Sequence, residues 1–292
     1  MSTETTNPLQ EWTATSLVAA ITAGRSTASA AVALSLARIA ERDPAIGAFQ
    51  VVRAEAAGRD AAAVDRVVKS GQHLPLAGVP VAVKDNIPVE GEPMRVGSAA
   101  TEDYPQLANH EVVRRLRAAG AIVVGTTRVP ELCVFGATDS VYGITRNPWD
   151  LERTPGGSSG GSAAALAAGL VPLAHGNDGM GSIRIPAACT GIVGIKPGGG
   201  VVPCDLGETD WYGLSENGAM GTTVADVALM LSVIADDPSL ATVSDAADGP
   251  ALRIRRVEPL DVVPRMHQRA RGLEQRAHVL AVDRDALHRG AG

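Results

Sequence analysis

The sequence predicts an α/β fold whose sheet is covered by helices on both faces. From Leu76 onward, short apolar runs rich in β-branched residues alternate with segments of helical character. Strands that alternate with helices are typical of a sheet buried on both sides. The chain has 292 residues, of which 45% are apolar and 20% charged. A chain of this size and composition can bury a substantial core, as one large domain or two ordinary ones.

The first part of the chain, residues 1–75, is predicted to be a helical segment that packs on the core. Helices are expected over residues 12–23, 27–42 and 53–69. Ser26 or Thr27 caps the second helix, because their side chains satisfy free backbone N–H groups at a helix start. The segment carries no group of reactive side chains.

Residues 76–240 form the predicted central unit. The expected strands are 79–83, 121–124, 171–174 and 192–195, and the expected helices are 110–119, 161–168 and 222–235. This unit holds the glycine-rich and lysine-containing motifs on which the functional interpretation depends.

Residues 241–292 form a tail of different composition. Residues 251–292 contain nine Arg, no Lys and five acidic residues, a net charge of +4, which leaves −10 for residues 1–250. Two interpretations stay open: one or two solvated amphipathic helices, or a non-native ending such as an out-of-frame extension. Terminal segments are in any case where disorder concentrates.

Composition argues against several classes of protein. The net charge is −6 and there are eight aromatic residues, so neither a basic surface nor a stacking platform for nucleic acid is predicted. Residues 1–10 do not resemble a signal peptide and 163–174 is too short to cross a bilayer, so no membrane association is expected. Cys133, Cys189 and Cys204 are too scattered for a disulfide framework, which favours a reducing cytoplasm. No histidines have metal-ligand spacing, so neither metal nor cofactor is expected.

Lys84 is the first candidate for chemistry. It follows the apolar run 79–83, so it is expected at the end of a buried strand, where open α/β sheets bind ligands. Most lysines are solvated surface charges, but a lysine drawn into a dry site has a lowered pKa. Its neutral amine can then act as a general base near neutral pH.

Two glycine-serine runs supply hydroxyl groups. Ser182 ends the run 178–182, whose backbone N–H groups could converge on a developing oxyanion; the alternative is a tight turn with a capping serine. Ser158 lies in the run 156–162 and could bridge Lys84 to Ser182; the alternative is a flexible loop with incidental serines. A nucleotide site is disfavoured, because Gly160-Gly161-Ser162 lacks the lysine of a P-loop.

Together these motifs resemble the amidase signature family. The motifs are Val83-Lys84-Asp85-Asn86, Pro155-Gly156-Gly157-Ser158-Ser159-Gly160-Gly161-Ser162 and Gly181-Ser182-Ile183-Arg184-Ile185-Pro186, and the resemblance extends from about Leu76 to Ala235. Spacing agrees as well as identity, since 74 residues separate Lys84 from Ser158 and 24 separate Ser158 from Ser182.

The resemblance implies a large mixed sheet sandwiched by helices and a Ser-cisSer-Lys triad. By position, Ser182 is the nucleophile, Ser158 bridges after a cis Gly157–Ser158 peptide, and Lys84 is the base. The same correspondence implies two further sets of residues: oxyanion-hole amides at Gly179, Met180, Gly181 and Ser182, and supporting roles for Asp178, Arg184 and Ser159. The implied reaction is hydrolysis of a small-molecule amide to a carboxylic acid and ammonia or an amine.

The sequence also departs from the family pattern. Met180 replaces a usual glycine, and Asn177 stands where Ser or Thr is usual. Family members commonly continue well over a hundred residues beyond the point that matches Ala235, so C-terminal strands are expected to be missing. Exposed sheet edges favour self-association, which makes a homo-oligomer one alternative. The competing function is a truncated, non-catalytic relative that acts as a binding or assembly module.

Overall fold

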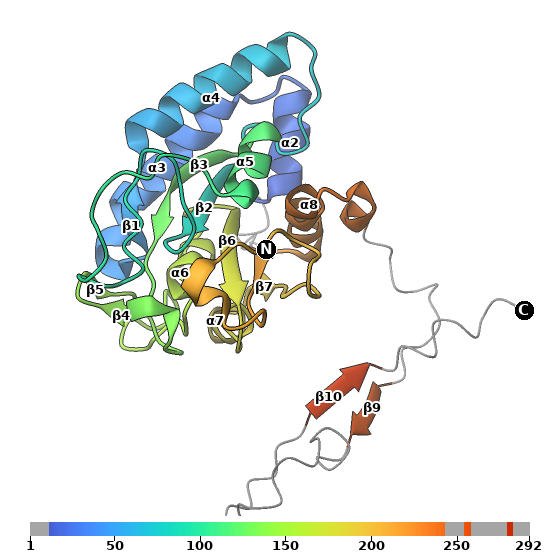
Figure 1. Cartoon of the computed structure of the whole chain (residues 1–292). Helices are drawn as coiled ribbons and strands as arrows, with labels where there is room; N and C mark the ends of the chain where they lie inside the picture. The colour runs from blue at the N-terminus through green and yellow to red at the C-terminus, as the bar shows by residue number, and fades with distance from the viewer. Residues whose placement is uncertain (1–11, 243–253, 258–278, 283–292) are drawn as a thin grey trace, which may run out of the picture. The chain divides into compact units, whose positions relative to one another are not determined.

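The computed structural model describes residues 12–242, 254–257 and 279–282 (Figure 1). Its backbone contacts divide the chain into two units, residues 1–243 and 244–292. In the second unit, β9 (Ile254–Val257) pairs antiparallel with β10 (Val279–Val282). The interpretation of the tail as amphipathic helices is wrong for these two segments, which are strands. The rest of the Arg-rich tail lies outside the described residues, and the interpretation as a non-native ending stays a prediction.

The first unit is built on a six-stranded mixed sheet with the order β1-β3-β2-β6-β8-β7. The strands are β1 (Phe49–Val52), β2 (Pro80–Lys84), β3 (Ile122–Thr127), β6 (Leu173–Asp178), β7 (Val193–Gly194) and β8 (Glu216–Gly221). Strand β2 runs parallel to both of its neighbours, β3 and β6. The strands β1, β8 and β7 pair antiparallel with their neighbours. The predicted α/β sheet is therefore present, and it is mixed.

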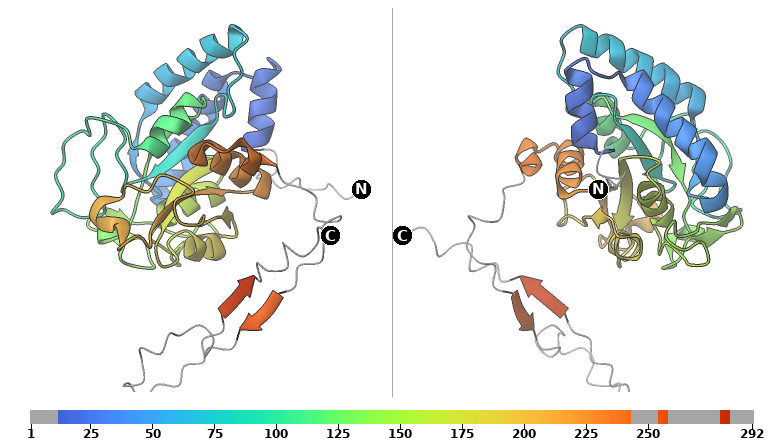
Figure 2. Two further views of the ribbon diagram at one scale, coloured as in Figure 1. Left: turned by 45° about the vertical axis from the view of Figure 1, so that its right-hand side comes forward. Right: turned by 180° about the vertical axis from the view of Figure 1, so that it is seen from behind.

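Helices cover both faces of this sheet (Figures 1 and 2). One face packs against α2 (Ala14–Thr22), α5 (Glu111–Ala118) and α8 (Val224–Ala235). The other packs against α3 (Ala28–Ile46), α4 (Ala54–Lys69) and α6 (Gly160–Ala167). The shorter elements are α7 (Arg184–Thr190), η1 (Glu131–Cys133), η2 (Gly207–Asp210), η3 (Pro238–Ala241), β4 (Asp139–Ser140) and β5 (Gly143–Ile144).

Strand β2 shows why a continuous apolar run forms the centre of the sheet. Side chains alternate between the two faces of a strand. Val81 and Val83 accordingly pack in the core under α5 and α8, whereas Ala82 packs in the core under α3 and α6. Both faces are buried, so every position of β2 excludes water, including its last residue, Lys84.

The three N-terminal helices form close to their predicted limits. Thr27 caps α3 as expected, since its Oγ1 accepts a hydrogen bond of 3.0 Å from Ala30 N. The helix continues to Ile46, four residues beyond the predicted end, and stops at Gly47 with φ of 69°. A left-handed residue at this position is the common way to end a helix, and glycine adopts it without strain.

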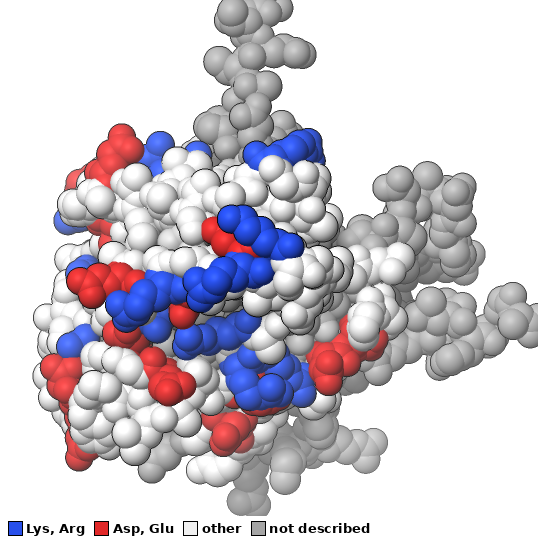
Figure 3. Space-filling view, turned by 90° about the horizontal axis from the view of Figure 1, so that it is seen from above, with Lys and Arg blue, Asp and Glu red and all other residues white. Residues whose placement is uncertain are grey.

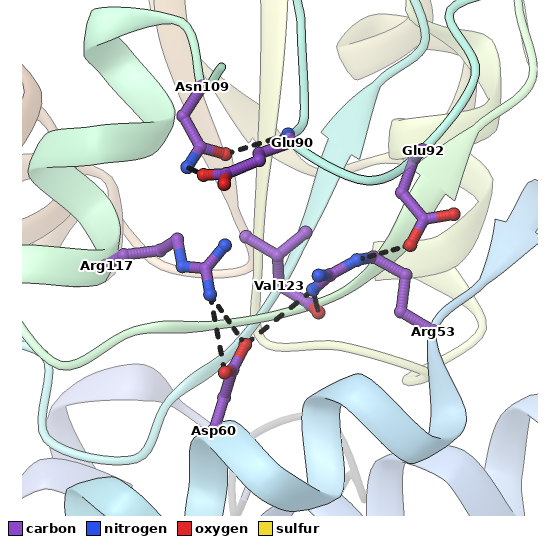
Figure 4. Close-up of polar contacts among 7 residues, drawn as sticks. All are labelled: Arg53, Asp60, Glu90, Glu92, Asn109, Arg117 and Val123. Carbon is purple, nitrogen blue, oxygen red and sulfur yellow. Dashed lines mark hydrogen bonds and ion pairs between the residues drawn. The ribbon is translucent and has the colours of Figure 1, made fainter. Parts of the chain in front are cut away.

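A buried arginine joins α4 to the sheet and to the loop that follows β2 (Figure 4). Arg53 donates from Nε to Glu92 Oε1 at 2.9 Å and from NH1 to the carbonyl oxygen of Val123 at 2.9 Å. Its side chain is 5% exposed. Asp60, on α4, pairs with Arg117 at 3.1 Å. These contacts attach the N-terminal helices to the central unit.

Charged side chains on the surface seen from above are of both signs (Figure 3). Basic side chains form a band across this face, and acidic side chains lie along it. Surface pairs such as Arg59 with Glu55, at 3.7 Å, show the same mixing of charge. In the part of the chain that the structure describes, no helix has both the length and the apolar character needed to cross a membrane.

Candidate active site

Lys84 lies at the carboxyl end of β2, between two parallel neighbours, and its side chain is fully buried. Its Nζ donates to Ser158 Oγ at 2.8 Å and to Asn177 Oδ1 at 2.6 Å. The carboxyl ends of parallel strands meet at one edge of a sheet, which is where such folds bind ligands. The strand-end position predicted for Lys84 is therefore correct.

Burial also shifts the pKa of Lys84. Removal from water disfavours the ammonium form, so the pKa of Lys84 is lowered, while Cys133 and Asp178 act in the opposite direction. A lysine with a lowered pKa is a base that can accept a proton near neutral pH.

Ser158 reaches Lys84 from the glycine-rich loop before α6. The Gly157–Ser158 peptide is cis, as the resemblance implies, and Gly156 has φ of +83°. A side chain at Gly156 would be strained at that φ and would meet Pro186. The glycines thus allow the loop to pass close to α7 and to place the Ser158 hydroxyl beside the amine.

Ser158 and Ser182 line one cavity of about 160 Å³, which we call the serine cavity. Its walls include Asn86, Cys133, Val134, Phe135, Asn177, Met180, Ile185 and Trp211. Within the described residues, no hydrogen bond joins the Ser158 and Ser182 side chains. Catalytic hydrogen bonds are often loose in the absence of substrate, so a shared cavity is compatible with proton transfer between the two hydroxyls.

The backbone around Ser182 presents hydrogen-bond donors. The amides of Gly179, Met180 and Ser182 donate no hydrogen bond to any described residue. The structure differs from the prediction at Gly181, whose N–H donates to Asp178 Oδ1 at 2.7 Å. Gly181 has φ of +119°, a conformation that favours glycine, and this turns its amide toward the carboxylate. Three of the four predicted oxyanion donors therefore remain available.

Asp178 and Arg184 support this turn, as the resemblance implies. Arg184 donates from Nε and NH2 to the two Asp178 oxygens, each at 2.9 Å. Burial by itself would raise the pKa of Asp178, but hydrogen bonds from Arg184 and three backbone amides lower it to about 2. The carboxylate thus stays charged and holds the turn that carries Ser182.

Ser159 connects the two serine-bearing segments. Its backbone N–H donates to the carbonyl oxygen of Ser182 at 3.1 Å, and its Oγ donates to the carbonyl oxygen of Asn177 at 3.3 Å. It is fully buried. Its contacts hold the Ser158 loop against the end of β6 and the Ser182 turn.

Sequence reasoning did not assign a role to Asn86, Cys133 or Asn177, all of which line the serine cavity. Asn86 is visible in the sequence only as part of a motif, and Asn177 only as a departure from the family pattern. The sequence favours an ordinary buried thiol at Cys133, and burial does raise its pKa. Among the described residues, no group of His, Cys, Asp or Glu side chains is arranged to hold a metal ion.

Comparisons with known proteins identify the family to which this fold and site belong. The family model described as Amidase matches residues 30–260. The chain therefore belongs to the amidase signature family.

Several relatives illustrate the similarity. A putative amidase, AmiB2, of Mycobacterium bovis is 45% identical over 216 residues, which are 74% of this chain and 46% of the relative. An acylamidase of Rhodococcus erythropolis is 40% identical over 224 residues, 76% of this chain and 47% of that protein. The native peptide amidase of Stenotrophomonas maltophilia superposes with a TM-score of 0.70 at 35% identity, covering 84% of this chain and 52% of that one. The chain spans about half the length of these relatives.

Proposed function

We propose that the chain hydrolyses the C–N bond of a small amide through an acyl-enzyme on Ser182, with Ser158 as proton relay and Lys84 as base. The observation that carries this proposal is the 2.8 Å hydrogen bond between buried Lys84 Nζ and Ser158 Oγ at the wall of the cavity that Ser182 also lines. Family membership supports the class of reaction.

In the first half of the reaction, Ser182 Oγ bonds to the amide carbonyl carbon. Its proton moves to Ser158 Oγ, whose own proton moves to Lys84 Nζ. The carbonyl oxygen becomes an oxyanion, which the free amides of Gly179, Met180 and Ser182 can stabilise. One such donor is typically worth about 3 kcal/mol. The C–N bond then breaks, and the leaving nitrogen takes a proton from Ser158, which Lys84 replenishes.

In the second half, water attacks the ester of Ser182. The same relay accepts the proton of the water and returns one to Ser182 Oγ, which releases a carboxylic acid and restores the starting state. Neither half requires a metal or an organic cofactor.

The walls of the site favour a neutral amide with apolar substituents. No charged side chain is found among the described residues that line the serine cavity, and Phe135, Ile185 and Trp211 contribute apolar surface. Trp211 also borders a second cavity of about 820 Å³, the apolar cavity, lined by Met94, Leu132, Leu206 and Tyr212 among others. A charged substituent in the serine cavity would lose hydration without gaining an ion-pair partner from the described residues that line it.

We also propose that the protein works in a reducing compartment such as the cytoplasm. Cys133, Cys189 and Cys204 are all free thiols, and Cys189 is exposed. Exposed unpaired thiols persist more readily where disulfide formation is suppressed.

A serine-directed fluorophosphonate probe tests the proposed function. Wild-type protein should be labelled, and Ser182→Ala and Lys84→Ala should each abolish labelling. Ser70→Ala is the matched control, because Ser70 is exposed at the end of α4, and it should label like wild type. Cooperatively folded wild-type protein that is never labelled would instead favour the non-catalytic binding module.

A further inference from the structure

A second hydrogen bond of Lys84 is made to a side chain outside the three residues of the relay. Lys84 Nζ donates to Asn177 Oδ1 at 2.6 Å, and Asn177 Nδ2 donates to Asn86 Oδ1 at 2.8 Å. Asn177 is 5% exposed and Asn86 is 6% exposed. An ordered chain of hydrogen bonds thus runs from the base through two buried amides.

The direction of this chain follows from the chemistry of its members. A charged lysine can only donate, so an oxygen of Asn177 must face Nζ in that state. The Nδ2 group of Asn177 then points to Asn86, which must present its own oxygen. Asn86 therefore locks the orientation of the Asn177 amide, and a reversed Asn177 would place two donors against each other.

We propose that Asn177, locked by Asn86, is a positioning residue that directs the lone pair of the Lys84 amine at Ser158. A neutral amine has two hydrogens and one lone pair. When one hydrogen is held by Asn177 Oδ1, rotation about the last bond of the side chain is restricted. The lone pair can then face Ser158 Oγ, where the proposed relay delivers its proton.

The neutrality of Asn177 is the second part of the inference. Four titratable groups surround Lys84: Cys133 and Asp178, which interact with its charge directly; His175, which is fully buried nearby; and Asp85, the next residue in the chain. None of them accepts a hydrogen bond from Nζ in the described structure. A carboxylate in contact with Nζ would favour the ammonium form, whereas an amide oxygen orients the amine without adding charge.

Asn86 also connects this pair to the substrate. It lines both the serine cavity and the apolar cavity, and its Nδ2 donates no hydrogen bond to any described residue. That group is available to an acceptor on a bound amide. Occupation of the cavity would then be communicated to Lys84 through Asn177.

The chain contains three lysines, Lys69, Lys84 and Lys196, so the base can be titrated directly. We suggest following ¹³Cε-labelled lysine by NMR as a function of pH, with the Lys84 signal assigned from Lys84→Arg. Asn177→Asp should raise the titration midpoint of Lys84 by about one pH unit or more, because an opposite charge in contact favours the charged form. Asn177→Leu should lower it, since an acceptor of the ammonium is lost.

The matched control is Asn147→Asp. Asn147 is also about nine-tenths buried and donates to two backbone carbonyls, but it does not contact Lys84. Its replacement should lower stability without moving the Lys84 midpoint. If Asn177→Asp does not fold, Asn177→Ser and Asn86→Ala test the same idea, and both should lower the midpoint. Equal midpoints in wild type and in all folded variants would overturn the proposal.

The role in catalysis rests on the proposed function, and a second measurement separates the two. The rate of fluorophosphonate labelling should rise with pH along the titration of Lys84, and Asn177→Asp should move that rise to higher pH. At a fixed pH below the midpoint, the labelling rate should fall about tenfold for every pH unit by which the midpoint rises. If the Lys84 midpoints of the variants shift in the expected directions but wild-type protein is not labelled, the hydrolase proposal is contradicted and the positioning of Lys84 is not. Labelling profiles that do not differ between wild type and Asn177→Asp contradict the positioning role.

Discussion

Arg184 and Asp178 form a two-point ion pair across the turn that carries Ser182, with both N–O distances at 2.9 Å. The Asp178 carboxylate is fully buried, whereas the side chain of Arg184 is 57% exposed. Arg184, which lies at the surface, therefore holds the turn that carries Ser182 against the buried Asp178 carboxylate at the end of β6.

Replacing Arg184 should destabilise the protein moderately and impair the turn. Arg184→Met removes two charge-assisted hydrogen bonds but leaves three backbone amides on Asp178. We expect the free energy of unfolding to fall by about 1–2 kcal/mol, at the lower end for such bonds because Arg184 is half exposed. Urea unfolding measures the change. Arg153→Met, which removes an exposed pair with Asp150, should have a clearly smaller effect.

The buried histidine of β6 should make stability depend on pH. Burial lowers the pKa of His175 to about 3, although its hydrogen bond with Asn217 acts in the opposite direction. His175 Nδ1 has no hydrogen-bond partner among the described residues. In the folded state, His175 therefore stays neutral at pH values where the same side chain takes up a proton in the unfolded chain. The free energy of unfolding consequently falls as the pH drops below the ordinary histidine pKa.

The size of this effect follows from proton linkage. Between about pH 7.5 and about pH 5, this group should lower the free energy of unfolding by about 2 kcal/mol. Urea unfolding of wild type and His175→Asn at both pH values isolates the contribution of His175. In the variant, most of the difference in the free energy of unfolding between the two pH values should disappear. His73→Gln, at an exposed position, should keep it. A variant that loses as much stability as wild type would contradict the assignment.

Met180 should restrict the size of the substrate. Its side chain is 68% exposed and lies at the wall of the serine cavity. Met180→Gly should raise kcat/KM for an amide with a bulky acyl group, relative to a small one, by roughly tenfold, which is a typical effect of reshaping an apolar pocket. The ratio for a benzoyl and an acetyl anilide measures this. Leu107→Ala, at a side chain 94% exposed and outside both cavities, should leave the ratio unchanged.

Arg53 should be more important for stability than any surface arginine. Its side chain is 5% exposed and pairs with Glu92 at 2.9 Å, as Figure 4 shows. Arg53→Met leaves that carboxylate partly buried without its cation, which typically costs about 3 kcal/mol or more. Thermal and urea unfolding test this. Arg59→Met is the control on the same helix, because Arg59 is 72% exposed, and it should have little effect.

Local patterns predicted the helices and the central strand because their signals lie within one segment. The cap at Thr27 and the apolar run before Lys84 each depend on neighbouring residues, and both appear close to the expected positions. Two strands of the six-stranded sheet were not predicted. β8 contains Gly218 and Gly221, which weaken a strand signal, and β1 is only four residues long. β8 forms because β6 and β7 pair with its two edges.

By itself, the sequence determined the family and the α/β class, and it predicted Lys84, Ser158 and Ser182 as site residues, because motif residues and their spacing can be read along the chain. Only the tertiary structure decided which groups touch those residues. Asn177 reaches Lys84 because β6 lies parallel to β2, so that both strands end at one edge of the sheet. Gly181 turns away from the cavity because the Asp178 carboxylate binds its N–H. Contacts between segments about ninety residues apart depend on strand register and burial, which no local pattern encodes.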